Sequence, residues 1–486
     1  MTAEHTDVVI VGAGLSGIGA AYHLTEKCPH QQFLILESRN AIGGTWDLFR
    51  YPGIRSDSDM HTLGYSFKPW NSAKAIADGP SILRYVKETA AENHIDEKIR
   101  YSHKLTAANW NSDSRCWTLT VTQTDTGNSV QISCNFLYMC AGYYNYEQPH
   151  EPELPELNNF KGTVVHPQFW PKDLDYENKK VVVIGSGATA VTLVPSMADK
   201  AANVTMLQRS PTYIISRPSE DWFANGMRAL LPPKLAYAIT RFRNTRFQEW
   251  IYKRTRRNPT RIKKILLDAV RKELGPDFDV DKHFTPKYNP WDQRLCLVPD
   301  SDLFAALKNN SADVVTDHIE KFTATGISLK SGDQLDADIV VTATGLQLVL
   351  MGGAAISIDG EAVDFSKLWT YKGLMNSDIP NMVTTFGYIN ASWTLRADLT
   401  AEWVCRLLNH MNETQSSSVV PRVSAELNNM PQRDWIDDFP AGYMARVMHL
   451  FPKQGNQEPW INTQDFYRDR KLFNQPFDQD QSLFFS

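Results

Sequence analysis

The sequence lacks the features that mark exported, membrane-spanning or metal-dependent proteins. Its six cysteines include no C-x-x-C pair, which predicts free thiols in a reducing cytoplasm. Its twelve histidines form no i, i+4 pair and no cluster with cysteine, so we expect no metal site. The first residues lack the basic and apolar parts of a signal peptide, and no apolar run approaches the roughly 18 residues of a membrane-spanning helix. We therefore expect a cytoplasmic protein.

Net charge is also small. A value of −5 at pH 7 gives no reason to expect a nucleic-acid partner. With 42% hydrophobic and 22% charged residues, the composition is that of an ordinary globular protein. A chain of 486 residues is long enough for two or three domains and a large core. The composition carries no signal for an oligomeric state.

What the sequence does contain is a glycine-rich loop in the context of a dinucleotide site. Residues 7–11 form an apolar run of strand length, Gly12, Gly14 and Gly17 follow it, and a helical pattern covers residues 18–24. The first glycine permits a tight turn, the second lets the backbone approach a pyrophosphate, and the third packs helix against strand. The helix N-terminus adds partial positive charge. This context predicts a dinucleotide-binding unit.

An acidic residue follows the next predicted strand. Residues 33–36 are apolar and end in Glu37, twenty residues beyond Gly17. A carboxylate at this spacing accepts the two ribose hydroxyls of a dinucleotide such as FAD. The alternative for Glu37 is a solvated charge at the end of a strand.

A second glycine loop has a different character. Residues 180–184 repeat the apolar strand, and the loop after it consists of Gly185, Ser186, Gly187, Ala188, Thr189 and Ala190. The following strand, residues 204–207, leads to Arg209 and Ser210 instead of an acid. An acid there would repel a 2′-phosphate, whereas an arginine with a neighbouring hydroxyl would bind it. The second site therefore favours NADPH, with a solvated Arg209 as the alternative.

These patterns predict an α/β fold with two Rossmann-like dinucleotide-binding domains, FAD first and NADPH second, and a helical insertion. Two further strands that end in small-residue turns, at 136–142 and 338–345, resemble the paired crossings between such domains. The predicted boundaries place the FAD-binding domain at 1–145 and 339–486, the latter with the C-terminal segment. The NADPH-binding domain covers 146–220 and 288–338, and the insertion covers 221–287.

Positive charge concentrates in the predicted insertion. Between Arg241 and Lys272 twelve lysines and arginines stand against Glu249, Asp268 and the adjoining Glu273. A simple solvated face is the plainest interpretation of this charge. Attraction of NADPH and loose peripheral contact with anionic lipid, on the inner face of the cell membrane, are the sharper alternatives.

Two motifs give the chain a specific resemblance. Residues 160–171 read F-x-G-x-x-x-H-x-x-x-W-P, and residues 44–57 read G-x-W-x-x-x-x-Y-P-G-x-x-x-D. With both glycine loops, the sequence resembles the class B flavoprotein monooxygenases and, within them, the type I Baeyer–Villiger monooxygenases. Segments 43–59, 288–297 and 390–395 are similar to the ethionamide monooxygenase branch. His166, in the first motif, is expected to be a hydrogen-bonded linker residue, with Trp170 packed in the same linker.

The resemblance implies a set of cofactor-binding residues. Ser16 and Glu37 would hold the phosphates and ribose of FAD, and the Leu105 backbone would meet its adenine. Arg209 and Ser210 would hold the NADPH 2′-phosphate. The remaining residues implied beside the flavin are Gly44, Thr45, Trp46, Arg55, Ser56 and Asp57.

The resemblance also implies two catalytic residues. Arg294 stands where the family has its active-site arginine, and Asp57 matches the carboxylate that orients it. Oxygen adds to reduced flavin at C4a, and the resulting peroxide attacks ketones when deprotonated but oxygenates sulfur or nitrogen when protonated. A guanidinium that keeps its charge favours the anion. Gln293 departs from the family, which often has lysine there, so one positive charge for the 2′-phosphate is missing.

The function predicted is an NADPH- and O2-dependent monooxygenase that converts ketones to esters or lactones, with oxygenation of sulfides or thioamides as a second activity. An enzyme that oxygenates only nitrogen and sulfur is the nearest alternative. A dithiol flavin reductase needs a redox cysteine pair near the flavin, and none follows Gly44. A non-catalytic NADPH sensor is the remaining alternative.

Overall fold

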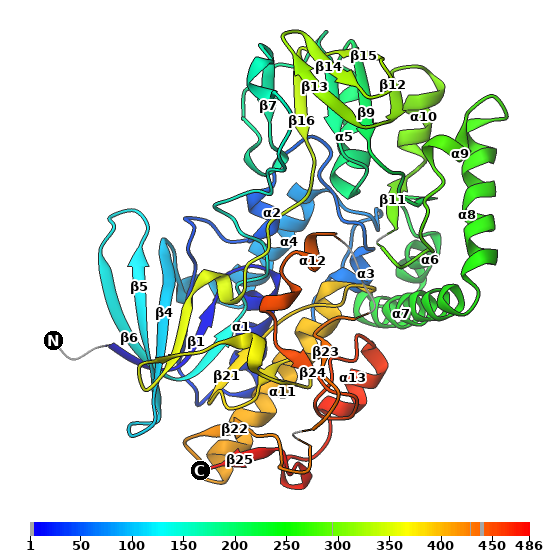
Figure 1. Ribbon diagram of the computed structural model, residues 1–486. Coiled ribbons are helices and arrows are strands. Elements are labelled where there is room, and N and C mark those ends of the chain that lie inside the picture. The colour runs from blue at the N-terminus through cyan, green and yellow to red at the C-terminus, as the bar shows by residue number, and fades with distance from the viewer. Residues whose placement is uncertain (1–3, 294, 428, 438–441) are drawn as a thin grey trace.

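The computed structural model describes residues 4–293, 295–427, 429–437 and 442–486. Two sheets dominate it, a mixed one and a parallel one, the second above the first in the view of Figure 1. Helices cover both sheets, and a group of long helices lies to one side. The predicted α/β fold with two Rossmann-like units and a helical insertion is confirmed.

The first sheet has nine strands in the order β18-β17-β4-β5-β6-β1-β2-β3, with β21 also paired to β6. Its strands are β1 (Glu4–Val11), β2 (Phe33–Leu36), β3 (Ile99–Arg100), β4 (His103–Asn111), β5 (Cys116–Gln123), β6 (Ser129–Met139), β17 (Ala355–Ile358), β18 (Glu361–Ala362) and β21 (Met382–Thr384). Val8 of β1 lies between Phe33 of β2 and Phe136 of β6, in parallel register with both. Because β1 is central, its carboxyl end delivers the glycine loop to the middle of the sheet edge.

The second sheet has five parallel strands in the order β12-β9-β8-β16-β7. They are β7 (Thr163–Val165), β8 (Lys180–Ile184), β9 (Asn203–Gln208), β12 (Ala312–Thr316) and β16 (Ile339–Thr342). Almost every residue of β8 and β16 is buried, as expected for strands covered on both faces. The strand β16 belongs to this sheet, although the predicted boundary assigns residues 339–486 to the FAD-binding domain; the domain boundaries remain a prediction.

The helices range from single turns to 25 residues. They are α1 (Leu15–Lys27), α2 (Thr45–Leu48), α3 (Met60–Leu63), α4 (Gly79–Glu92), α5 (Ala188–Ala198), α6 (Trp222–Leu230), α7 (Pro233–Arg257), α8 (Pro259–Leu274), α9 (Val280–His283), α10 (Asp302–Lys308), α11 (Trp393–Glu413), α12 (Gly442–Ala445) and α13 (Phe466–Phe473). Small sheets complete the fold: β10 (Ile214–Arg217) with β11 (Cys296–Pro299), β13 (Ile319–Thr323) with β14 (Gly326–Leu329) and β15 (Gln334–Asp336), β19 (Thr370–Tyr371) with β20 (Met375–Asn376), β22 (Val419–Pro421) with β25 (Leu483–Phe485), and β23 (Arg433–Asp434) with β24 (Lys453–Gln454).

The helical insertion consists of α6, α7, α8 and α9, which occupy residues 222–283. The strands that precede and follow it, β10 and β11, pair in parallel, with Ile214 opposite Cys296. This pairing closes the insertion at its base. The helices themselves form the right-hand side of the molecule in Figure 1.

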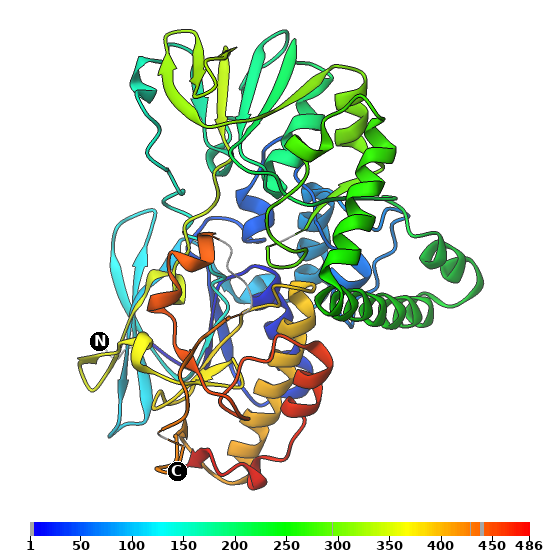
Figure 2. The ribbon, with the colours of Figure 1, turned by 45° about the vertical axis from the view of Figure 1, so that its right-hand side comes forward.

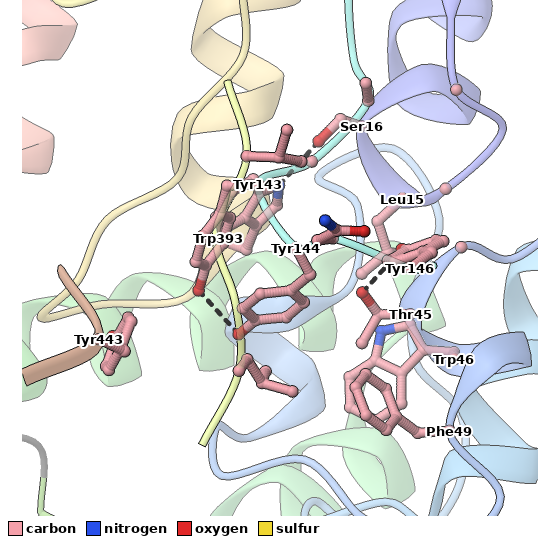
Figure 3. Close-up of a pocket in the computed structure, with 18 of the residues that line it drawn as sticks. Leu15, Ser16, Thr45, Trp46, Phe49, Tyr143, Tyr144, Tyr146, Trp393 and Tyr443 are labelled. Carbon is pink, nitrogen blue, oxygen red and sulfur yellow. Dashed lines mark hydrogen bonds between the residues drawn. The ribbon is translucent and has the colours of Figure 1, made fainter. Parts of the chain in front are cut away.

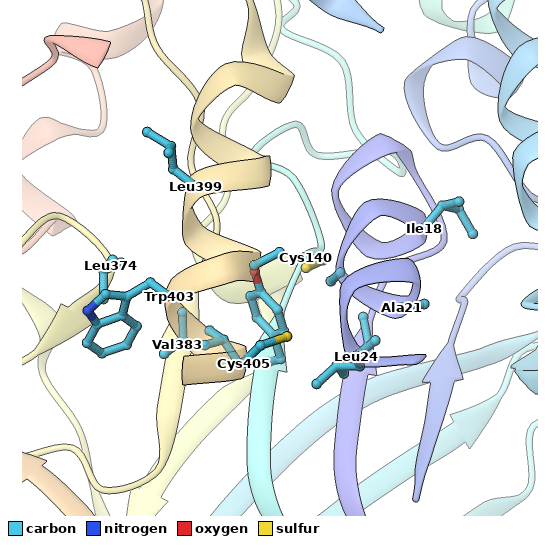
Figure 4. Close-up of a cluster of buried hydrophobic side chains, with 14 of the residues drawn as sticks. Ile18, Ala21, Leu24, Cys140, Leu374, Val383, Leu399, Trp403 and Cys405 are labelled. Carbon is cyan, nitrogen blue, oxygen red and sulfur yellow. The ribbon is translucent and has the colours of Figure 1, made fainter. Parts of the chain in front are cut away.

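The largest apolar core lies under the first sheet, between α1 and α11 (Figure 4). Ile18, Ala21 and Leu24 of α1 and Trp403 and Cys405 of α11 are all buried in this core, and Leu24 and Cys405 lie in the space between the two helices. Small residues on α1 let the two helices approach closely. This packing fixes the N-terminus of α11 beside the first glycine loop.

The two connections between the sheets are joined to each other. The Asn145 N–H donates to the Gln347 carbonyl at 2.8 Å, and the Val349 N–H donates to the Tyr143 carbonyl at 3.0 Å. Tyr144 and Leu348 form the antiparallel bridge between these bonds. The chain therefore leaves the first sheet and returns to it through one short two-stranded ribbon.

Candidate functional site

A cavity of about 780 Å³ lies where loops from both sheets meet. Ligands of open α/β sheets bind at the carboxyl ends of the strands, and a volume of this order suits an organic cofactor. The predicted residues that line the cavity are Gly12, Gly14, Ser16, Glu37, Gly44, Thr45, Trp46, Arg55, Ser56, Asp57, Leu105, Ser186, Gly187, Ala188 and Thr189. Residues predicted separately from two glycine loops thus border one continuous space.

The first glycine loop leaves its backbone open to a ligand. Gly12 has φ +103°, and a Cβ atom there would lie 2.6 Å from the Cys140 carbonyl oxygen, so no other residue fits without a shift. Gly14 precedes α1, and a Cβ on Gly44 would lie 3.1 Å from the Gly14 Cα. Two backbone turns without side chains therefore meet at a helix N-terminus, which is a ready site for a pyrophosphate.

Glu37 is buried at the carboxyl end of β2, with 4% of its surface exposed. Its carboxylate accepts the N–H groups of Ala13 at 2.8 Å and Arg39 at 2.9 Å. Burial raises the pKa of the carboxyl, and the two backbone N–H groups partly oppose that rise. A solvated charge at a strand end does not fit these contacts, because the group is held in place and lines the cavity.

Ser16 has a partner that its motif does not reveal. The indole Nε1 of Trp393 donates to the Ser16 hydroxyl at 2.7 Å, so the first residue of α11 is tied to the first turn of α1 (Figure 3). Trp393 also stacks on Tyr143, with ring centroids 5.2 Å apart, and the hydroxyls of Tyr143 and Tyr144 lie 2.8 Å apart. These rings form an aromatic wall of the cavity.

The segment after Gly44 forms the opposite wall. Thr45 and Trp46 open the short helix α2, and the Thr45 hydroxyl lies 3.2 Å from the hydroxyl of Tyr146 (Figure 3). Burial raises the pKa of Tyr146 to about 12, so this phenol keeps its proton at neutral pH. Leu105, on β4, is buried in the adjoining core and borders the cavity.

The second glycine loop repeats the packing of the first. Gly185 has φ +146°, and a Cβ there would lie 2.4 Å from the Ala343 carbonyl oxygen at the end of β16. The Ser186 hydroxyl donates to the Ser210 carbonyl at 2.9 Å, which ties the loop to the residues after β9. Ala190 is fully buried within α5, whereas Arg209 is exposed and lies outside the cavity lining. This second loop is the more open of the two.

The Y-P-G part of the second motif joins the two units. Gly53 has φ +74°, and a Cβ there would lie 1.8 Å from the Ser196 hydroxyl oxygen on α5. Tyr51 is hydrogen-bonded to the side chain of Thr189, and burial raises its pKa to about 12. The glycine is needed because α5 passes directly over this turn.

The residues that follow this turn have local partners. Arg55 pairs with Asp302 at the start of α10, and the Ser56 hydroxyl donates to the Ser58 carbonyl at 2.7 Å. Asp57 lines the cavity, as does Gln293. The predicted catalytic Arg294 lies outside the described residues.

The histidine of the F-x-G-x-x-x-H motif, His166, accepts a hydrogen bond from the backbone close to it in sequence. The His166 Nδ1 accepts the Gln168 N–H at 3.1 Å, and burial lowers its pKa. Trp170 packs against the core of the second sheet. Neither residue lines the cavity.

Sequence reasoning missed most of the aromatic lining. Tyr143, Tyr144 and Tyr146 lie in the connecting segment after β6, Phe386 lies in the one after β21, and Trp393 begins α11. Only Trp393 stands in a segment that the resemblance had selected, residues 390–395. A density of aromatic residues just after β6 was the available signal for the three tyrosines, and Phe386 had none.

Two further observations concern other kinds of site. Within the part of the chain that the structure describes, no three histidine, cysteine or acidic side chains gather closely enough to hold a metal ion. In that same part, every helix is too short or too polar to cross a membrane.

Comparison with known proteins identifies relatives over the whole chain. The model of the flavin-binding monooxygenase-like family matches residues 66–283, and that of NAD(P)-binding Rossmann-like domains matches residues 10–78. The chain is 50% identical over 484 residues to FAD-containing monooxygenase EthA of Mycobacterium tuberculosis, covering 99% of this chain and 98% of that protein. It is also 50% identical over 477 residues to the probable FAD-binding monooxygenase AlmA of Acinetobacter baylyi, covering 98% and 95%.

Solved structures share the fold at lower identity. Oxidized steroid monooxygenase bound to NADP superposes with a TM-score of 0.78 at 21% identity and 99% coverage of both chains. The OTEMO complex with FAD and NADP gives 0.77 at 20% identity over both complete chains.

The fold and the cavity define a protein with two dinucleotide-binding units. The relatives are more specific: the chain belongs to the flavin-binding monooxygenase-like family. The predicted resemblance to class B flavoprotein monooxygenases is thereby confirmed, and EthA is among the relatives found. The predicted cofactors, FAD and NADPH, are confirmed by relatives named as FAD-containing and by structures of this fold that hold FAD and NADP.

Proposed function

We propose that the protein is an NADPH- and O2-dependent monooxygenase that converts ketones to esters or lactones, a Baeyer–Villiger oxidation. Oxygenation of sulfides or thioamides is the proposed second activity. The observation that carries the proposal is the shared cavity, in which Asp57 and Gln293 face a space also lined by both glycine loops. Bound FAD supplies the redox chemistry, since it accepts a hydride from NADPH and activates oxygen.

The cavity residues suit FAD at the first loop. The bare turn at Gly12, Gly14 and Gly44 would hold the pyrophosphate at the N-terminus of α1. The buried carboxylate of Glu37, already fixed by two N–H groups, would accept the ribose hydroxyls with its remaining lone pairs. Ser16 would support the phosphates, and Thr45 and Trp46 would lie against the flavin.

NADPH would bind at the second loop. The N-terminus of α5, with Ser186 and Thr189, would hold its pyrophosphate. Arg209 is exposed at the end of β9, so its guanidinium is free to reach a 2′-phosphate together with Ser210. Because Gln293 brings no charge, Arg209 would be the main cation for that phosphate.

The proposed catalytic pair is Arg294 with Asp57. A guanidinium keeps its positive charge at all working pH values, so Arg294 would stabilise the negative charge that develops on the attacking and carbonyl oxygens. The Asp57 carboxylate would orient it. The aromatic wall around Tyr143 and Trp393 would exclude water from the reacting atoms.

Product analysis tests this proposal. The purified enzyme with NADPH, a ketone and a thioether should yield both ester and sulfoxide, identified by mass spectrometry. Arg294→Met should lower the rate of ester formation by about 100-fold or more while FAD stays bound. Arg84→Met, on the exposed face of α4, is the matched control and should leave both products unchanged.

The outcome separates the alternatives. Sulfoxide without any ester would establish an enzyme that oxygenates only nitrogen and sulfur. An unchanged ester rate in Arg294→Met would refute the proposed role of the arginine. If NADPH fails to reduce the flavin under anaerobic conditions, the protein is a sensor and not an enzyme.

A further inference from the structure

The outer face of α7 is apolar, where a helix at the surface of a water-soluble protein is normally polar. Leu235, Ile239 and Phe242 follow one another at spacings of four and three residues, so they form one stripe. Phe242 is 61% exposed, and Trp250, further along the helix, is 57% exposed. The Arg246 guanidinium lies 5.6 Å from the Phe242 ring centre, and the stripe remains open to solvent.

The inner face of the same helix is polar. Thr240, Asn244 and Thr245 are buried, and the Asn244 amide donates to Asp59 at 3.1 Å and to Asp221 at 3.2 Å. The helix is therefore fixed with its apolar side outward by specific hydrogen bonds. Rotation of α7 to bury the stripe would leave these polar groups without partners.

The helix α6, which packs on α7, also exposes large apolar side chains. Trp222 and Leu230 are each 77% exposed, more than any other large apolar side chain in the described residues. We call the whole surface the α6–α7 apolar face; it consists of Trp222, Leu230, Leu235, Ile239, Phe242, Phe247 and Trp250. Figure 2 shows the green helices α6 and α7 projecting from the body of the molecule.

Positive charge surrounds this face. The helix α7 carries eight lysines and arginines and one acid, Glu249, although the whole chain has a net charge of −5. Lys234, Arg254 and Arg257 form no ion pair with any acid in the described ranges, and the Arg254 guanidinium lies 5.8 Å from the Trp250 ring centre. Apolar and aromatic side chains flanked by unpaired cations are the composition of helices that lie in an anionic membrane interface.

We propose that the α6–α7 apolar face docks the protein onto an anionic lipid bilayer surface. The apolar side chains would enter the boundary between headgroups and acyl chains, and the cations would contact the lipid phosphates. A second copy of this chain fits less well, because a twofold contact would place two strongly positive helices against each other. This inference does not depend on the proposed reaction.

Vesicle flotation with the full-length, FAD-loaded protein tests the proposal. The protein should float with phosphatidylcholine vesicles that contain about 30% phosphatidylglycerol and remain unbound with phosphatidylcholine alone. Raising the salt from about 0.05 M to about 0.5 M should weaken the binding. The double variant Phe242→Ser/Trp250→Ser should bind about tenfold more weakly or worse.

A matched control removes exposed apolar side chains elsewhere. Leu450 and Phe484 are each 49% exposed and lie outside the α6–α7 apolar face. The double variant Leu450→Ser/Phe484→Ser should bind vesicles like the native protein. Lys234→Gln/Arg254→Gln/Arg257→Gln should lose the preference for phosphatidylglycerol.

A second readout uses the native protein and does not depend on the folding of the serine variants. Vesicles with brominated acyl chains should quench its tryptophan fluorescence, and Trp222→Phe/Trp250→Phe should lose that quenching. Equal binding to neutral and anionic vesicles would overturn the proposal, as would no binding to either. A stable dimer in sedimentation that Phe242→Ser/Trp250→Ser dissociates, without lipid binding, would assign the face to a second copy instead.

Discussion

Two glycines with nearly the same φ angle have very different surroundings. Gly53 has φ +74° and Gly127 has φ +76°, but only at Gly53 would a Cβ meet another group, the Ser196 hydroxyl oxygen at 1.8 Å. Gly127 has open space around it. Alanine at Gly127 therefore measures only the cost of a positive φ, whereas alanine at Gly53 adds the cost of a steric overlap with α5.

Gly53→Ala should lower the free energy of unfolding by about 3 kcal/mol or more, and Gly127→Ala by about 1–2 kcal/mol. The difference between them reports the contact of the Y-P-G turn with α5. Urea unfolding followed by tryptophan fluorescence measures both values. Equal losses in the two variants would show that α5 yields to the extra methyl group.

Glu37 makes FAD binding depend on pH. Burial raises the pKa of this carboxyl, and the ionised form is the one that accepts ribose hydroxyls. FAD affinity should therefore fall as the pH is lowered through that raised pKa. In the protein without FAD the sign is reversed, because a raised pKa favours the protonated folded form, whose contribution to stability is lost as the pH rises.

Glu37→Gln should weaken FAD binding about 10- to 100-fold and abolish this pH dependence. Glu26→Gln, on the exposed side of α1, should change neither. Fluorescence titration of the FAD-free protein with FAD, repeated across the pH range, measures both effects. A pH profile that survives in Glu37→Gln would assign the titration to another group.

At the scale of elements, one arginine on α7 contacts two other helices. Arg241 donates to the carbonyl oxygens of His61 at 3.0 Å and Gly64 at 2.7 Å, at the C-terminal end of α3. It also lies 3.6 Å from Asp398 on α11. A single guanidinium therefore links three helices from distant parts of the sequence, beside the hydrogen bonds that Asn244 makes from the same helix.

Arg241→Gln should cost about 2–4 kcal/mol of stability and should speed tryptic cleavage within α7. Arg243→Gln is the matched control: its exposed pair with Asp221 should cost less than about 1 kcal/mol. Thermal unfolding and timed proteolysis measure the two effects. Equal cleavage rates in both variants would contradict the anchoring role of Arg241.

The elements that the sequence predicted are those with strong local patterns. Strands at 33–36 and 180–184 have the predicted bounds, because buried parallel strands are continuous apolar runs between turn residues. The insertion was recognised from its helical, basic composition. The orientation of α7 could not be predicted in the same way. An apolar side of a helix is normally expected to face the core, but the hydrogen bonds of Arg241 and Asn244 turn this one toward solvent.

In the candidate site, too, residues with a local sequence pattern were predicted and residues placed by distant contacts were not. The glycine loops and Glu37 follow spacing rules set by backbone geometry, so their residues could be named in advance. Trp393 reaches Ser16 across 377 positions of sequence, and only the packing of α11 on α1 brings them together. Such contacts between distant segments leave no local signal.

At the scale of the whole molecule, FAD should stabilise both units. The cavity is lined by both glycine loops and by the Y-P-G turn against α5, so a bound ligand restrains the two sheets together. Removal of FAD should lower the unfolding midpoint, and FAD at about 100 times its dissociation constant should restore about 2.7 kcal/mol.

Differential scanning calorimetry of the FAD-stripped and reconstituted protein measures this linkage. NADP+ alone should raise the unfolding midpoint by less than FAD does, because the second glycine loop is open to solvent on its Arg209 side. A midpoint that NADP+ raises as far as FAD does would contradict the assignment of FAD to the first, less open glycine loop.

The ribbon formed by Tyr143–Asn145 and Gln347–Val349 limits how the second sheet can move relative to the first. Two strands bonded to each other bend and twist as one strap, whereas sliding would break the hydrogen bonds at Asn145 and Val349. Any movement of the second sheet relative to the first would therefore bend the ribbon and not slide one strand along the other, and would also have to carry the Arg55–Asp302 pair with it.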